Sequence, residues 1–226
     1  VLILYKQNNG NMIWDVYGYD RSGMIYVLAG IFTIVVIIIG GIKGIKSLVS
    51  LIFTLVTVIF LMLPLMFRGL EPMLAAILSA ILSIIVTLSL VSGINKKTAT
   101  AIIGTISGVV ISGIIAYIFG ELTHSSGMTM NDTESLIYIA EGTNLKVKGI
   151  MFAGILIASL GAVMDVAMSI SSSLFEIYEV NKNIKQIDLF KSSMNIGKDI
   201  IGTMTNTLIL AFAGGSITTL ILIFAA

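Results

Sequence analysis

One acidic residue, Asp165, lies deep inside a long apolar stretch of the sequence, residues 149–177. Gly161, Ser169 and Ser173 are spaced from it in steps of four residues, so all four share one face of a helix. A carboxylate in the middle of a membrane span costs at least about 2.5–3.5 kcal/mol and therefore faces other helices or water. Asp165 is the first candidate for chemistry, as a proton or cation relay or as a substrate contact.

A second polar stripe follows in the last apolar block, residues 201–225, and just before it. We expect the two stripes to face one another, because hydrocarbon offers no hydrogen bonds and these stripes are the most polar in the apolar part of the chain. The candidate intramembrane polar site comprises Asp165, Ser169, Ser172, Asp199, Thr203 and Asn206. A structural interpretation stays open: a protonated Asp165 bonded to a hydroxyl would serve helix packing alone.

Other chemistry has little support in the sequence. There is no cysteine, and His124 is the single histidine, so the residue types of a zinc site are missing. No phosphate-binding loop, metalloprotease helix or serine-hydrolase elbow is present. An intramembrane hydrolase using Asp165 and Asp199 is the least favoured hypothesis, since its two carboxylates would have to share a proton. We expect no enzyme and no catalytic, cofactor or metal site.

The composition indicates that lipid surrounds most of the chain. Hydrophobic residues make up 57% of it and charged residues 11%, whereas soluble domains are about 25% charged. The apolar blocks lie at 25–42, 47–67, 73–94, 99–119, 149–177 and 201–225. Because a span needs about 20 residues, the predicted fold is an all-α integral membrane helical bundle with about six transmembrane helices. Pro64 predicts a kink inside the second block.

The first residues have a different pattern. An Asn-Gly pair at 9–10 separates two β-prone runs, which predicts a short β-hairpin. We therefore expect two domains. Residues 1–22 form an extracytoplasmic hairpin that ends a preceding β-rich domain, and residues 23–226 form a polytopic transmembrane domain. In this interpretation the sequence is a piece of a longer chain.

The distribution of Lys and Arg predicts the orientation, since these residues are enriched in cytoplasmic loops. With the N-terminus outside the cell membrane, the inside segments carry Lys43, Lys46, Lys96, Lys97, Lys182, Lys185, Lys191 and Lys198. The outside segments carry Lys6, Arg21, Arg68, Lys146 and Lys148. Eight of the 13 basic residues are then inside, and the bias is consistent at every short loop.

Small residues recur at four-residue spacing and predict seams where helices pack closely, since lipid supplies no hydrophobic force between helices. One ladder is Ala75, Ser79, Ser83 and Thr87, and another is Gly104, Gly108, Ser112 and Ala116. Substitution of Gly108 by Leu should therefore disrupt packing more than the same change at Gly120.

The strings GAVMDVAMSISSSLFE (161–176) and GKDIIGTMTNTLILAFAGG (197–215) resemble the YibE/F-like family of multi-pass bacterial membrane proteins. Residues 20–21 and the string GIKGIK at 41–46 are also similar to that family. The resemblance covers nearly the whole chain and implies a polytopic helical protein. It implies no catalytic role for any residue.

Two hypotheses of function remain in the foreground. The first is a transporter or permease-type membrane component with a polar intramembrane site around Asp165. The second is a structural or regulatory membrane subunit without transport activity. Either would have the lipid bilayer as its surroundings and other membrane subunits or a second copy of the chain as partners. The near-neutral charge gives no reason to expect nucleic acid.

Overall fold

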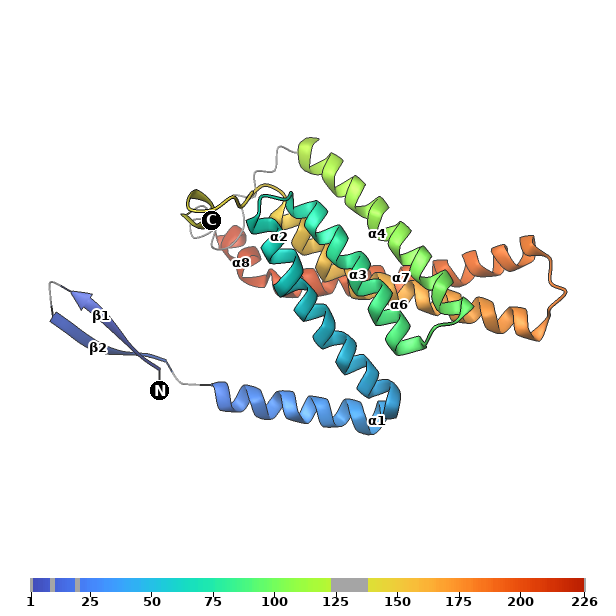
Figure 1. Ribbon diagram of the computed structural model, residues 1–226, viewed down its shortest axis with the longest axis horizontal. Helices are drawn as coiled ribbons and strands as arrows, with labels where there is room; N and C mark the ends of the chain where they lie inside the picture. Colours follow the sequence, from blue (N-terminus) through green and yellow to red (C-terminus); the bar gives the residue numbers. More distant parts are fainter. Residues whose placement is uncertain (1, 9–10, 19–20, 123–137, 226) are drawn as a thin grey trace. The chain divides into compact units, whose positions relative to one another are not determined.

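A computed structural model describes residues 2–8, 11–18, 21–122 and 138–225 (Figure 1). By the contacts between their residues, they form two compact units, 1–49 and 50–226.

The first unit begins with two antiparallel strands, β1 (Leu2–Asn8) and β2 (Asn11–Gly18). Asn8 lies opposite Asn11, and the residues between them fall outside the described ranges. That this hairpin ends a preceding β-rich domain stays a prediction.

Helix α1 (Ser22–Thr57) bends sharply at Gly41, where φ is 52° and ψ is −133° (Figure 1). Glycine adopts positive φ without the steric penalty of a Cβ atom. Past the bend the chain passes so close to the preceding turns that a Cβ on Gly44 would collide with the carbonyl oxygen of Val36. The sequence predicted a loop between two spans at this point, and the structure has a bent helix instead.

In the described part of the chain, four helical stretches are long and apolar enough to cross a membrane: Ser22–Phe67, Pro72–Ser92, Lys96–Leu122 and Ile150–Val180. The predicted number of six is wrong. The first two apolar blocks lie in one stretch of 46 residues, because a bend replaces the expected loop. The last block is divided between α7 (Gln186–Gly215) and α8 (Ile217–Ala225), and the polar residues of α7 lower its hydropathy.

A π-helical turn, η1 (Val58–Met62), follows α1 and precedes α2 (Leu63–Phe67). The backbone N–H of Leu63 reaches the carbonyl of Val58, five residues back. Pro64 lies directly after this turn. Its ring lacks an N–H and would clash with the carbonyl four residues back in a regular α-helix, so the wider turn explains how the helix continues. The irregularity at this point is thus a π-helical turn, and the predicted kink at Pro64 stays a prediction.

In the second unit, α3 (Pro72–Ser92), α4 (Lys96–Leu122) and α6 (Ile150–Val180) pack against one another, and η1 and α2 pack on α3. The interior face of α3 is built from small residues, all at most 1% exposed: Ala75, Ala76, Ser79, Ala80 and Ser83. Small side chains let helix backbones approach closely. The predicted α3 seam is confirmed, and at its end Thr87 Oγ1 lies 3.4 Å from Thr54 Oγ1.

The buried face of α4 differs from the predicted one. Ala101, Thr105, Val109 and Gly113 are buried, whereas Gly104, in the predicted ladder, is exposed. A Cβ on Gly113 would lie 2.7 Å from Ile77 Cδ1 of α3. The α4 prediction failed because small residues occur on several sides of this helix, so their spacing alone does not identify the packed face.

Polar contacts link the helices of this bundle near both of its ends. At one end Ser171 Oγ donates a 2.7 Å hydrogen bond to the carbonyl of Lys97, which links α6 to the start of α4. Toward the other end Lys148 Nζ lies 2.8 Å from Glu121 Oε1. This hydrogen bond raises the pKa of Lys148 above its ordinary value. The residues before α4 and after α6 therefore share an end, as the predicted topology requires.

Candidate functional site

Asp165 lies at the midpoint of α6 (Ile150–Val180) on a face that the bundle leaves open. Gly161, Asp165 and Ser169 are all exposed, whereas Leu160 and Ser171 on the opposite side are buried. Among the described residues, no hydrogen bond or salt bridge to the Asp165 carboxylate occurs. An acid in the middle of a membrane span needs a partner. The described side chains around Asp165 do not supply one, so the partner must be something else.

The residues of the predicted stripe on α7 are exposed as well. Asp199, Thr203 and Asn206 are exposed, and Thr203 Oγ1 donates to the carbonyl of Ile200 at 2.9 Å within its own helix. Thr207 Oγ1 donates in the same way to the carbonyl of Thr203, at 3.1 Å. These hydroxyls are satisfied locally, which removes the reason to pair with Asp165.

Helices α6 and α7 do pack together, as predicted, but through apolar side chains. A Cβ on Gly197 of α7 would lie 3.5 Å from Ile170 Cδ1 of α6, and Ile201, Met204 and Leu208 line a cavity between the two helices. Among the described residues, no hydrogen bond joins Asp165 to Thr203 or Asn206. Ser172, which lies about two helical turns from Asp165, is half-buried.

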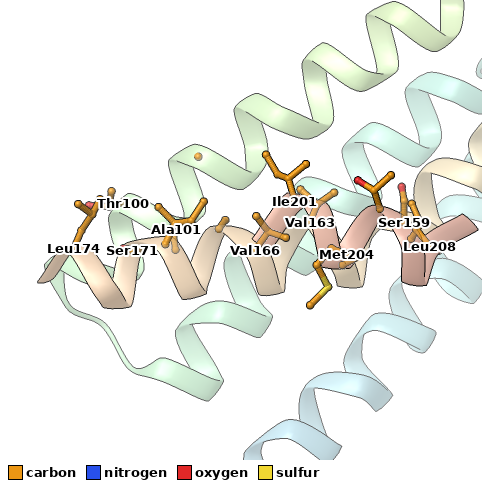
Figure 2. Close-up of a pocket in the computed structure, with 15 residues that line it drawn as sticks. Thr100, Ala101, Ser159, Val163, Val166, Ser171, Leu174, Ile201, Met204 and Leu208 are labelled. Carbon is orange, nitrogen blue, oxygen red and sulfur yellow. The ribbon is translucent and has the colours of Figure 1, made fainter. Parts of the chain in front are cut away.

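The structure has a cavity that sequence reasoning missed. It has a volume of about 490 Å³ and lies between α4, α6 and α7 (Figure 2). Its walls are mostly aliphatic and comprise Thr100, Ala101, Gly104, Ser159, Ala162, Val163, Val166, Ala167, Ile170, Ser171, Leu174, Ile201, Met204, Thr205 and Leu208. Apolar residues of this kind occur throughout the sequence, so only the small residues Ala101 and Gly104 gave any signal.

Most hydroxyls in the cavity wall already have a backbone acceptor. Ser171 donates to the carbonyl of Lys97, Ser159 donates to that of Leu156 at 3.0 Å, and Thr100 donates to that of Lys96 at 2.9 Å. The cavity therefore offers aliphatic surface to a ligand and is suited to an apolar chain more than to an ion. Asp165 does not line it.

A metal site has no support in the described part of the chain, where no three acidic, histidine or cysteine residues gather. Comparison with known proteins gives one match: the profile of a family described as YibE/F-like protein covers residues 28–226. Neither the curated proteins nor the solved structures that were compared contain a match.

Proposed function

The chain belongs to the YibE/F-like family, and from this premise we propose that it is a permease-type component of the cell membrane with Asp165 as its proton- or cation-binding group. The observation that carries this proposal is the place of Asp165, at the centre of a 31-residue apolar helix and without a partner among the described side chains. An ionisable group at that depth is costly, and proteins place such groups on ion and substrate pathways.

The exposed face around Asp165 indicates how such a pathway would be built. Since Gly161 and Ser169 are exposed beside it, a second surface must cover this face to exclude lipid from the carboxylate. A second copy of the chain or another membrane subunit would supply that surface. The hydroxyl of Ser169, one helical turn away, would be available as a further ligand for a proton-bearing water or a cation.

Ion movement through reconstituted vesicles tests the proposal. The full chain is placed in vesicles that contain a pH-sensitive or sodium-sensitive dye, and an ion gradient is imposed. We expect the wild type to dissipate one of these gradients and Asp165→Asn to remain folded without doing so, because an amide cannot bind and release a proton. Asp188→Asn, which changes an exposed acid in the first turn of α7, is the matched control and should keep the wild-type rate. Equal rates for Asp165→Asn and the wild type would contradict the proposal.

A structural or regulatory subunit is the second candidate, and one observation favours it: Asp165 does not line the cavity between α4, α6 and α7. In this case Asp165 would be a protonated acid that bonds a partner helix. Asp165→Asn should then complement the growth defect of a deletion strain, because an amide also donates and accepts hydrogen bonds. Asp165→Leu should fail to complement. The two candidates thus predict different phenotypes only for Asp165→Asn, which should be inactive if Asp165 binds a proton or cation and active if Asp165 is structural.

We further propose that the end of the bundle with Lys96 is cytoplasmic and that the N-terminus lies outside the cell membrane. The excess of Lys at that end supports this orientation. The chain has no cysteine to interfere with labelling. A cysteine at position 146 should react with a membrane-impermeant maleimide added to intact cells, and one at position 96 should not. Labelling at position 96 alone would reverse the orientation.

A further inference from the structure

The cavity between α4, α6 and α7 continues toward the end of the bundle where α4 begins. A second cavity, of about 250 Å³, is lined there by Lys96, Phe175, Tyr178 and Leu189. Three residues, Thr100, Ser171 and Leu174, line both cavities. The two cavities therefore adjoin, and together we call them the α4/α6/α7 groove.

The groove has the shape and surface that an acyl chain requires. Along α6 its lining residues extend from Ser159 to Tyr178, a rise of about 28 Å, whereas one leaflet of hydrocarbon is about 15 Å thick. Its walls are aliphatic, and most of its hydroxyls are bonded to backbone carbonyls. Helices α4 and α7 do not pack on one another in the described part of the chain, so the groove opens between them.

A positive charge lies at one end of this apolar surface. Lys96 is the first residue of the 27-residue helix α4, and a helix N-terminus itself favours negative charge. Among the described residues Lys96 forms no salt bridge. A ligand with an aliphatic tail and an anionic head at the membrane surface matches both parts of the groove, and basic pockets between membrane helices bind such lipid head groups.

We propose that the α4/α6/α7 groove binds an anionic phospholipid, with one acyl chain along α4, α6 and α7 and the phosphate at Lys96. This site is separate from Asp165 and holds whether or not the protein transports an ion. A zwitterionic lipid with the same tails would fit the apolar part but would lack the net charge that Lys96 selects.

Native mass spectrometry of the full chain in mild detergent tests this proposal. The protein is offered an equal mixture of phosphatidylglycerol and phosphatidylcholine with identical acyl chains. One lysine near a membrane surface contributes enough for a preference on the order of fivefold, so we expect the wild type to retain phosphatidylglycerol by about that factor. Inorganic phosphate alone should not displace it, because most of the contact is with the tail.

Two variants separate the head from the tail. Lys96→Gln should reduce the preference to near unity while lipid is still retained, and Lys191→Gln, which removes an exposed lysine of α7, should leave it unchanged. Gly104→Leu should reduce retention of both lipids, because the space beside Gly104 is open to a larger side chain within the groove. Lys96 is exposed, so its variant remains decisive if Gly104→Leu does not fold. Equal retention of the two lipids by the wild type, or equal preferences in the two lysine variants, would overturn the proposal.

Discussion

Ser79 offers the sharpest test of how the interior of the bundle is built. Its side chain is fully buried in α3, and its Oγ is a buried polar atom without a hydrogen-bond partner among the described residues. We expect Ser79→Ala to be more stable than the wild type. The reason is that the methyl group of alanine occupies nearly the same space and has no polar atom to leave unpaired.

The size of the effect follows from the cost of that unpaired atom. Leaving a buried donor or acceptor unsatisfied costs about 1–3 kcal/mol. Hydrogen bonds between membrane helices are worth only about 0.6 kcal/mol on average, which favours the lower end of this range. We therefore expect the lower end of the range, a gain of about 1 kcal/mol in the free energy of unfolding for Ser79→Ala.

Reversible unfolding in mixed micelles measures this free energy, and Ser171→Ala is the matched control. Ser171 Oγ donates a 2.7 Å hydrogen bond to the carbonyl of Lys97, so its loss should cost about 1 kcal/mol. The two Ser→Ala changes should thus shift stability in opposite directions. If Ser79→Ala lost as much stability as Ser171→Ala, Ser79 would have a hydrogen-bond partner and the reasoning would be refuted.

Three further changes test the packing, the bend and the exposed ion pair. Gly113→Leu should lower the free energy of unfolding by about 1–3 kcal/mol, because a Cβ there would already lie 2.7 Å from Ile77 Cδ1 of α3. Gly108→Leu should cost less, since its Cβ would be in ordinary contact with Val163 Cγ1 at 3.7 Å. The same unfolding assay compares the two variants. Gly44→Ala should lower expression and melting temperature, because its Cβ would collide with a backbone carbonyl, while Gly40→Ala, with open space around it, should not. The pKa of Lys148 is raised by its carboxylate partner, so the small stabilisation from this pair should be present at neutral pH and disappear as pH rises through the raised pKa; melting temperatures of the wild type and Lys148→Gln should converge there.

Hydropathy predicted the membrane-spanning character of the chain because composition alone decides it. It did not predict the number of helices, since a loop and a bend have the same hydropathy. The positive φ of Gly41 makes the difference, and the sequence GIKGIK is compatible with both. The seam of α3 was predictable because its small residues lie on one face, whereas α4 has small residues on several faces.

The candidate site was less predictable. The stripes around Asp165 and Thr203 were identified, but their partners were not, because hydroxyls such as that of Thr203 can bond the preceding turn of their own helix. The groove could not be predicted either. Its walls have the same aliphatic residues as any lipid-facing helix, and only the arrangement of α4, α6 and α7 in space separates the two environments.

The small side chains of α3 have a consequence for the entropy of assembly. Burying an alanine loses almost no side-chain conformational entropy, whereas ordering a long side chain costs up to about 2 kcal/mol. Ala75, Ala76 and Ala80 are fully buried in α3, so this helix can pack against its neighbours without restricting many side-chain rotamers. Each backbone contact therefore contributes nearly its full packing energy. A larger residue that fitted the space would still weaken association, because its freedom in the separated helix would be lost on binding.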